Sequence, residues 1–598
     1  MTLRAIAGLL AFNVFVLAVG AGVLWGLRGW RWWTELVRLA GVAYFLGVAA
    51  LMVLTMLELV LGIPVDLVTV ALTGVGVVVA GIGVGRRRGF AAPGFRAPEW
   101  RFPRISVLAA LFLAGIVVYF ESLLRAARLA GVAREWDSWA NWLPKSKSLY
   151  LSERLDLEFL AVVPQLTSYP PGHTSIQALA FHAMGSPDTV TLHLQYAFMA
   201  IFFAAAVIGL LAGRVRDLIL FPVLLAFLVA RYLLDWLTTV YADLPMGYLI
   251  ALAALLVFLW IDERQSWHLA AATLLLSGAM LTKREGMLFA VCVLFAGLAA
   301  SLGERRRAWP RLVAAGLIAF ALVLPWRIWY TGHGISSVGP DTGYDGHVSD
   351  LDRLWPAFEI TLRSLVHPDL WHFAAVLAVA AIVLALLAGA WRISLYTAAF
   401  LVASVGAVTW ILWVNHGLTL IHEDWAIRRF VGTPMLVLAA LTPLLLQRAW
   451  SPGGVSGTSD LGARLGVLSV LHRPTGAAWA IVLVGLLSHP GSALVGYSGS
   501  GLPGGWPSFP GTAGCDARPE DGAGVRLVVG YADSYREATS LRERTRQAGL
   551  AEVETSQDGC GRLRVYVDDV PTAAAARELA SDAQAAGLTP TLEHDPDE

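Results

Sequence analysis

The chain contains 598 residues, of which 57% are hydrophobic and 15% are charged, and its formal net charge is zero. Soluble domains carry about 25% charged residues, so this composition excludes an ordinary soluble protein. No run of basic residues indicates a nucleic-acid partner, and we expect none.

Apolar segments long enough to cross a bilayer recur from the N-terminus to about residue 497. The first is too long for the hydrophobic region of a signal peptide and lacks a small-residue cleavage site, so we interpret it as a retained span. The pattern predicts an α-helical polytopic membrane protein with about 14 spans. The expected spans are 4–27, 34–62, 64–85, 105–129, 190–212, 218–234, 245–261, 268–282, 286–302, 312–330, 371–391, 394–414, 430–447 and 476–497.

Arginine clusters predict the orientation of these spans, because cytoplasmic loops are enriched in basic residues. Two clusters lie at 86–88 and 305–311. Smaller markers are Arg214, Arg216, Arg264, Arg392 and Arg448. With these on the cytoplasmic side, both termini and the junction near residue 283 are expected outside the cytoplasm, together with loops 130–189, 235–244, 331–370 and 415–429.

The composition changes after the last expected span. A Gly/Pro/Ser linker occupies 498–522, and a soluble domain follows at 523–598. Within it, "VRLVVGYADSYREATSLRERTRQAGL" (525–550) and "LRVYVDDVPTAAAARELASDAQAAGL" (563–588) are an internal repeat of strand, turn and helix. The repeat predicts a small α/β domain of order βαββαβ, which resembles a SPOR domain. The resemblance implies peptidoglycan binding, although "VDDVP" replaces a turn that usually contains Gly.

The chain contains three cysteines. Cys292 lies in an apolar span and is expected to be a small core residue. Cys515 and Cys560 both lie in the polar C-terminal region and can form a disulfide if that region faces an oxidising compartment.

Lysine is rare in this chain, with three Lys against 41 Arg. Lys145 and Lys147 follow Glu135 and Asp137 in "EWDSWANWLPKSKSLY" (135–150). A carboxylate at the membrane surface can accept a proton from an attacking hydroxyl. The Trp residues at 136, 139 and 142 predict one helical face. They equally fit an interfacial aromatic belt with solvated acids beside it.

Two further segments on the same expected face carry polar residues. In "TSYPPGHTSIQAL" (167–179), Tyr169 precedes a Pro-Pro break and His173 lies near the start of a helix. His173 can bind an anion or a sugar there, or belong to a structured turn. In "YADLP", Asp243 is either a substrate-binding carboxylate or the N-cap of a helix whose first turn contains Pro245.

Charged residues also interrupt apolar sequence in two places. Lys283, Arg284 and Glu285 lie within "LTKREGML". Ionisable residues at membrane depth are costly and usually functional, although a hairpin turn with snorkelling bases is the alternative. Arg428 and Arg429 precede a span on the side where positive charge is not expected. They fit a phosphate ligand, or are a chance surface pair.

The sequence contains no HExxH, no paired CxxC, no Walker loop and no GxGxxG that opens a helix after a strand. We therefore predict no metal site from protein ligands and no use of cytoplasmic ATP. A divalent cation shared with a loop carboxylate stays open as a cofactor.

Taken in order, "EWDSWANWLPKSKSLY", "SYPPGHTSIQAL", "YADLP", "TKREG" and "AIRRFVGTPMLVL" resemble segments of the GT-C superfamily of membrane glycosyltransferases, near glycosyltransferase family 39. The resemblance covers about residues 100–450. It implies a catalytic acid in the first large extracytoplasmic loop and a polyprenyl-phosphate sugar as donor. Many relatives carry an adjacent Asp-Glu pair, whereas Trp136 separates Glu135 from Asp137 here.

The resulting hypothesis is a hexosyl- or pentosyltransferase of the bacterial inner membrane, with its active site and C-terminal domain extracytoplasmic. Asp137 or Glu135 is the expected base. The expected phosphate ligands are Lys145, Lys147, Lys283, Arg284, Arg428 and Arg429, and the expected substrate ligands are Asp243, Tyr169, His173 and Glu285. The domains are N-terminal helices (1–104), a catalytic core (105–450), a cytoplasmic loop with the last span (451–497), the linker (498–522) and the SPOR-like domain (523–598). A transporter or flippase of lipid-linked glycans and a peptidoglycan-binding scaffold are the alternatives.

Overall fold

The computed structural model describes residues 1–94, 106–131, 133, 137–157, 169–333, 351–414, 424–450, 525–532, 535–550, 553–557 and 563–593. The chain divides into two compact units. The first contains Met1–Phe120 and Arg134–Leu487, and the second contains Glu121–Ala133 and Ser488–Glu598.

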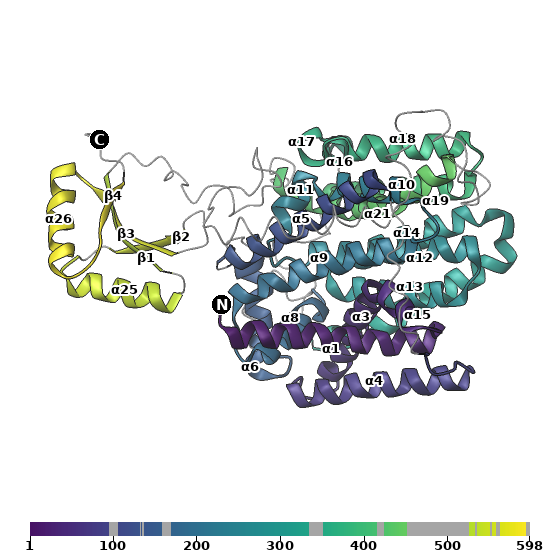
Figure 1. Ribbon diagram of the computed structural model, residues 1–598, viewed down its shortest axis with the longest axis horizontal. Helices are drawn as coiled ribbons and strands as arrows, with labels where there is room; N and C mark the ends of the chain where they lie inside the picture. The colour runs from purple at the N-terminus through teal and green to yellow at the C-terminus, as the bar shows by residue number, and fades with distance from the viewer. Residues whose placement is uncertain are drawn as a thin grey trace. The chain divides into compact units, whose positions relative to one another are not determined.

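The described part of the first unit is a bundle of helices (Figure 1). Its α-helices are α1 (Leu3–Arg28), α2 (Trp33–Arg38), α3 (Ala40–Val60), α4 (Leu67–Arg87), α5 (Val107–Leu129, whose end belongs to the second unit), α6 (Leu143–Ser152), α8 (Gly172–Met184), α9 (Thr189–Leu211), α10 (Asp217–Leu228), α11 (Arg231–Trp236), α12 (Asp243–Glu263), α13 (Ser266–Thr282), α14 (Glu285–Ala300), α15 (Arg305–Gly332), α16 (Leu354–Val366), α17 (Pro368–Trp371), α18 (Ala374–Leu387), α19 (Trp391–Val414) and α21 (Asp424–Trp450). A π-helix, η1, spans Ser138–Trp142, and single 3-10 turns occupy η3 (Leu302–Glu304) and η4 (Leu351–Arg353).

Nine helices of the described chain are long and apolar enough to cross a membrane, and a bent pair formed by Leu351–Trp371 and Ala374–Leu387 makes up to ten. Three shorter apolar helices, α10, α13 and α14, accompany them. These helices identify a multi-pass α-helical membrane protein.

Two of the expected spans are broken in the structure, and a third begins beside a sharp bend. The span expected at 34–62 divides at Leu39 into α2 and α3, and the one at 218–234 divides between α10 and α11. The span expected at 371–391 begins beside a bend of 112° between Leu351–Trp371 and α18, where His372 has a φ of 50°, and its remainder contains α18. Periodicity alone did not reveal the two breaks, because Leu39, Val229 and Ala230, the residues at them, are apolar. The span expected at 476–497 lies outside the described residues.

The core of the bundle surrounds α12, whose apolar window is entirely buried. Helices α13, α14, α21 and α9 pack around it. Helix α4 is at the other extreme, with 11% of its window buried, and it lies beside α1 (Figure 1). Exposed apolar faces such as that of α4 are what a bilayer would cover.

Helices α1 and α3 approach closely through glycine. A Cβ on Gly20 would lie 1.6 Å from the carbonyl oxygen of Ala43, and a Cβ on Gly47 would lie 2.0 Å from that of Val16. A side chain at either position therefore requires the two helices to separate.

A closed ring of three hydrogen bonds joins α1, α3 and α9. Asn13 Nδ2 donates to Gln195 Oε1 at 2.8 Å, and Gln195 Nε2 donates to the Tyr44 hydroxyl at 2.7 Å. The Tyr44 hydroxyl donates in turn to Asn13 Oδ1 at 2.7 Å. All three side chains are buried, and the ring satisfies their polar groups inside the bundle.

The smaller arginine markers gather at one end of the bundle. Arg448 pairs with Asp262 at 2.6 Å and Arg392 pairs with Glu304 at 2.7 Å. Arg264 also pairs with Glu304, and Arg214 pairs with Glu263. Since α12 ends at Glu263 and begins at Asp243, the arginine-rich end lies at the opposite end of this helix from Asp243.

The C-terminal part of the second unit is a four-stranded antiparallel sheet in the order β2-β3-β1-β4 with two helices packed on it (Figure 1). Its elements are β1 (Val525–Ala532), α25 (Tyr535–Gln547), β2 (Glu554–Gln557), β3 (Leu563–Val570), α26 (Ala573–Ala585) and β4 (Thr591–Glu593). Alternate strand residues such as Leu527 and Val565 form a core with Leu541 of α25 and Ala576 of α26. Gly549 and Gly587 follow the two helices with φ of 90° and 77°, so both repeats end their helix in the same left-handed turn.

Candidate functional site

Charged side chains from distant segments meet at the end of the bundle opposite the arginine markers. Asp243 Oδ1 accepts a hydrogen bond from Lys283 Nζ at 2.8 Å, and Asp243 Oδ2 accepts one from Arg429 Nη2 at 2.9 Å. Arg429 also pairs with Asp137, and Lys283 Nζ lies 3.4 Å from Glu285 Oε1. These five residues are called the ionic cluster below. Each of its two cations contacts two carboxylates, and such pairing is how buried charges are tolerated.

The five residues of the ionic cluster lie at or near the ends of helices. Asp243 is the first residue of α12, Lys283 directly follows α13, and Glu285 is the first residue of α14. Arg429 lies near the start of α21, and Asp137 directly precedes η1. The N-cap interpretation of Asp243 is wrong, because Ala242 is the cap residue and the Asp243 carboxylate faces the two cations instead.

The two aspartates of the cluster differ in availability. The Asp243 side chain is 3% exposed and uses both oxygens in bonds to cations. The Asp137 side chain is 14% exposed, and among the described residues only its Oδ2 contacts a cation. Asp137 therefore has the more accessible carboxylate of the two, while Asp243 contacts both Lys283 and Arg429.

Aromatic rings surround the cluster and hold its cations. The Arg429 guanidinium lies 4.5 Å from the Tyr241 ring centroid, and Lys283 Nζ lies 5.4 Å from that of Phe430. Such contacts favour a cation in a site with little water.

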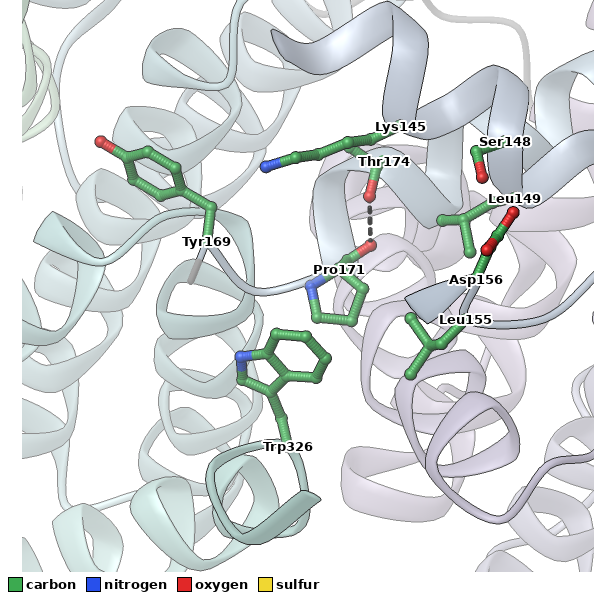
Figure 2. Close-up of a pocket in the computed structure, with 9 residues that line it drawn as sticks. All are labelled: Lys145, Ser148, Leu149, Leu155, Asp156, Tyr169, Pro171, Thr174 and Trp326. Carbon is green, nitrogen blue, oxygen red and sulfur yellow. Dashed lines mark hydrogen bonds between the residues drawn. The ribbon is translucent and has the colours of Figure 1, made fainter. Parts of the chain in front are cut away.

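A second pair of cations shares one aromatic ring. Lys145 Nζ lies 5.9 Å and the Arg284 guanidinium 5.5 Å from the centroid of Tyr169. Figure 2 shows Lys145 extending toward Tyr169 above Pro171, with Trp326 on the other side of that proline. Together with Leu155 and other residues these side chains line a recess of about 30 Å³. The recess has room for about one water molecule.

The charge of Lys145 depends on pH near neutrality. Lys145 is 6% exposed. Burial, reinforced by the nearby charge of Arg284 and opposed by that of Asp137, lowers the pKa of Lys145 to about 7. The ammonium is therefore present at mildly acidic pH and is lost as the pH rises above about 7.

His173 has a structural environment. It is 1% exposed, its Nε2 lies 2.9 Å from the Tyr196 hydroxyl, and its ring packs against the edge of Trp142. Burial lowers its pKa to about 4, so the ring is neutral near pH 7. A neutral, enclosed imidazole does not supply positive charge to an anion, and the structured-turn interpretation fits His173 better.

Other expected site residues take different positions. Lys147 is exposed, whereas Lys145 is buried, because residues two apart lie on different sides of a helix. Arg428 is only partly buried, and the cluster contacts described above involve its neighbour Arg429. Glu135, Cys515 and Cys560 lie outside the described residues, as does Trp136.

The tryptophans at 139 and 142 do not share one face. Trp139 is 55% exposed and Trp142 is fully buried. They belong to a π-helix, whose wider turn changes the angle between side chains three residues apart. Within this turn the amide of Asn141 and Nε1 of Trp142 are buried with no hydrogen-bond partner among the described residues.

Sequence reasoning did not single out Trp326, Tyr241 or Asn141 as site residues. Trp326 is one apolar residue in the expected span 312–330, and nothing in the pattern separates it from its neighbours. Tyr241 precedes Asp243 by two residues in "YADLP", and that proximity was the available signal.

The arrangement provides one accessible carboxylate beside several fixed cations in a largely dry environment. Such a set can remove a proton from a hydroxyl and can stabilise negative charge on a leaving group. In the described chain, no group of three or more His, Cys, Asp or Glu side chains is arranged to hold a metal ion.

Comparison with known proteins found no matching family model, no matching curated protein and no matching solved structure.

Proposed function

We propose that this chain is an integral membrane glycosyltransferase that moves a sugar from a polyprenyl-phosphate donor to an extracytoplasmic acceptor. The observation that carries the proposal is the ionic cluster, in which residues from four distant segments meet at the end of the bundle opposite the arginine-rich end. By the positive-inside rule the arginine-rich end is cytoplasmic, so the cluster faces the other side of the bacterial inner membrane.

In the proposed reaction Asp137 accepts the proton of the acceptor hydroxyl. The hydroxyl oxygen forms a bond to the anomeric carbon while the bond from that carbon to the phosphate oxygen breaks. The electron pair of the broken bond stays on the phosphate, which leaves as polyprenyl phosphate. Fixed cations near the leaving oxygen stabilise the charge that develops there.

The test is release of polyprenyl phosphate from a panel of polyprenyl-phosphate sugars by the purified protein in lipid. Asp137→Asn keeps the shape of the side chain and its ability to accept a hydrogen bond from Arg429, and it removes the base. We expect activity to fall by about 10²–10⁴-fold, the usual contribution of a general base. Asp262→Asn is the matched control, because Asp262 is also paired with an arginine but lies at the opposite end of α12.

Equal release by wild type and Asp137→Asn would remove Asp137 as the base and leave Glu135 as the candidate. No release with any donor and any hydroxyl acceptor, while lipid-linked glycan still crosses the bilayer of proteoliposomes, would replace the proposal by the flippase function.

We also propose that the C-terminal domain is SPOR-like and binds peptidoglycan. The observation in support is a tyrosine between two arginines. Arg526 and Arg564 lie 4.7 and 5.3 Å from the ring centroid of Tyr566, whereas Leu527 and Val565, the residues next to these arginines, point into the core. Because strand residues alternate between faces, both arginines and Tyr566 lie on the face away from the helices. Tyr566 is 8% exposed, so a glycan chain would contact chiefly the two partly buried arginines beside it.

Residues 525–593 have a core of their own, so the segment 520–598 can be tested alone. We expect it to sediment with purified peptidoglycan, and Tyr566→Ala to reduce the bound fraction. A domain that stays in the supernatant at all peptidoglycan concentrations would exclude this role.

A further inference from the structure

A cavity of about 200 Å³ lies at the arginine-rich end of the bundle. Its walls are the last turns of α12, the turn from α18 to α19 and the end of α21. Helix α21 packs on α12, α18 and α19, so these walls belong to one packed group of helices (Figure 1). A cavity of about 150 Å³ can hold a benzene molecule, so this one has room for a phosphate group.

Two arginines line this cavity, and their contacts in the described chain use only part of each guanidinium. Arg392 Nη2 donates to Glu304, and Arg448 Nη2 donates to Asp262, whose carboxylate also lines the cavity. Because a guanidinium has five N–H donors, both arginines keep donors for a ligand. The side chains of Arg392 and Arg448 are 43% and 34% exposed, so a molecule that enters from outside the bundle can reach them.

The charges of the ion pairs around the cavity do not cancel. Arg448 is paired with Asp262, whereas Arg392 and Arg264 share the one carboxylate of Glu304. One positive charge is therefore left over among these five residues, and it lies on the side of Arg392. An anion with a single negative charge would balance it, and the favourable position is beside Arg392 and away from the Asp262 carboxylate.

The start of α19 adds to this attraction. Trp391, Arg392 and Ile393 are the first residues of the helix, and all three line the cavity. The N–H groups of a first helical turn have no acceptor within the helix, and this end of a helix carries a partial positive charge. The two arginines and these N–H groups therefore favour the same sign of ligand.

The position of the cavity indicates that the anion belongs to a lipid. Helices α12 and α21 end and α19 begins beside it, so it lies at the depth where spanning helices reach the membrane surface. Trp391 lines the cavity and is 45% exposed, and tryptophan is enriched at this depth. Leu395 and Val402 follow on the same outer face of α19, four and eleven residues after Trp391. An acyl chain can lie along this face while its head group occupies the cavity.

We propose that this cavity binds the head group of a phospholipid with one negative charge, such as phosphatidylglycerol, through Arg392 and Arg448. Basic pockets between spanning helices on the cytoplasmic side suit anionic head groups. The assignment to the cytoplasmic leaflet rests on the proposed orientation of the chain, whereas the binding itself does not depend on the proposed sugar transfer. A head group in this cavity contacts α12, α21 and the turn from α18 to α19 at once and so holds them together.

The test is binding of dioctanoyl phosphatidylglycerol, a short-chain anionic lipid, to the purified full-length chain in micelles of an uncharged detergent. Arg392→Gln removes a charge-assisted hydrogen bond, and we expect it to weaken binding about tenfold or more. Ala390→Leu keeps both arginines and fills part of the cavity, and we expect it to weaken binding about fivefold or more. Arg87→Gln is the matched control, because Arg87 is an exposed arginine of the cluster 86–88 that does not line the cavity, and we expect it to bind like wild type.

Two further ligands separate the contributions of charge and acyl chains. Dioctanoyl phosphatidylcholine has the same chains and no net charge, and glycerol phosphate has the anion without the chains. We expect each to bind about tenfold more weakly than the anionic lipid, or not at all. Equal binding of phosphatidylcholine would show that the site does not recognise an anion, and equal binding of glycerol phosphate would show a free-anion site. Either result would overturn the proposal.

The variants can also contradict the proposal. A folded Arg392→Gln or Ala390→Leu protein with wild-type affinity would exclude the cavity as the site. An equal loss of affinity in Arg87→Gln would show only a general attraction to the arginine-rich end, which would overturn the proposal as well. The glycosyltransferase assay is independent of this test, because the cavity and the ionic cluster lie at opposite ends of α12. A chain that binds phosphatidylglycerol through Arg392 but releases no lipid phosphate from any lipid-linked sugar would support the lipid site and refute the enzymatic function.

Discussion

Replacement of Asp243 by Asn is the sharpest test of how the ionic cluster is held. Asp243 contacts both Lys283 and Arg429, and all three side chains are less than a tenth exposed. The change removes a negative charge between two buried cations and leaves Arg429 with Asp137 and Lys283 with Glu285. Breaking a buried ion pair on one side typically costs 3–5 kcal/mol, and the two remaining carboxylates place the expected cost at about 3 kcal/mol.

The control is Asp262→Asn, which removes the carboxylate of the Arg448–Asp262 pair. Those side chains are 34% and 29% exposed, so water screens the pair. Its loss should cost at most about 1 kcal/mol. A difference of about 2 kcal/mol between the variants corresponds to roughly 30-fold in the folding equilibrium.

The assay is unfolding of purified protein in mixed micelles by increasing SDS, followed by circular dichroism. We expect the midpoint to fall clearly for Asp243→Asn and little for Asp262→Asn. The double variant Asp243→Asn with Lys283→Met should be less destabilised than the two single changes added together, because the second change removes one of the two cations that Asp243 contacts. Equal midpoints for Asp243→Asn and Asp262→Asn would refute the view that Asp243 holds the cluster together.

Three other predictions concern single positions. The pKa of Lys145 is about 7 in the folded protein, below the ordinary lysine value of 10.5. Between these pH values the folded chain binds fewer protons than the unfolded chain, so its stability increases with pH. Lys145→Met should therefore be stabilising at pH 6, with an advantage in unfolding temperature that shrinks from pH 7 to pH 10; a constant advantage would contradict this. Gly20→Ala should lower the yield of folded protein, because its Cβ would lie 1.6 Å from the Ala43 carbonyl oxygen. Gly76→Ala has no atom within 4 Å of its Cβ and should be neutral or stabilising by about 0.5–1 kcal/mol. Gel filtration compares the yield of folded protein of the two variants. Gly549→Ala should destabilise the isolated C-terminal domain by about 1 kcal/mol in urea unfolding, because Gly549 has a φ of 90°, and an unchanged midpoint would show that the turn accepts a side chain.

The candidate site was predictable where charge stands out against an apolar background. Asp243, Lys283 and Arg429 lie at the ends of apolar segments, and the cost of charge in a membrane identified them before their contacts were known. The arginine markers placed these residues at the same end of the bundle. From those two arguments the meeting of Asp137 with the cluster could be expected, although its partner could not.

At the same site, the sequence did not predict which side of its helix each residue lies on or which residues are buried. Lys145 and Lys147 have the same chemistry, and only the packing of α6 decides that one is buried and the other exposed. The π-helix at Ser138–Trp142 shifts the positions of the tryptophans relative to a regular helix. Trp326 and Arg327 belong to a span whose hydropathy shows that it crosses the membrane but not which neighbours it meets.

In the fold, too, the helices were predictable from the sequence, whereas the breaks in the spans were not. Length and hydropathy predict each long helix, because a spanning segment must satisfy its own backbone hydrogen bonds. The break between α10 and α11 falls on the apolar residues Val229 and Ala230, so it depends on contacts that a one-dimensional pattern does not contain.

The ring of Asn13, Tyr44 and Gln195 has a consequence for the order in which the membrane part is assembled. Asn13 bonds to Leu9 within α1 and to Tyr44 of α3, but the ring closes only when Gln195 of α9 joins them. During synthesis α1 and α3 leave the ribosome long before residue 195, so Asn13 initially lacks the acceptor that Gln195 provides. A polar amide in hydrocarbon favours association with another helix that can bond to it. The N-terminal helices therefore reach their final arrangement only after α9 has been inserted, and a chain truncated before residue 189 should be held by the insertion machinery or degraded instead of forming a stable partial bundle.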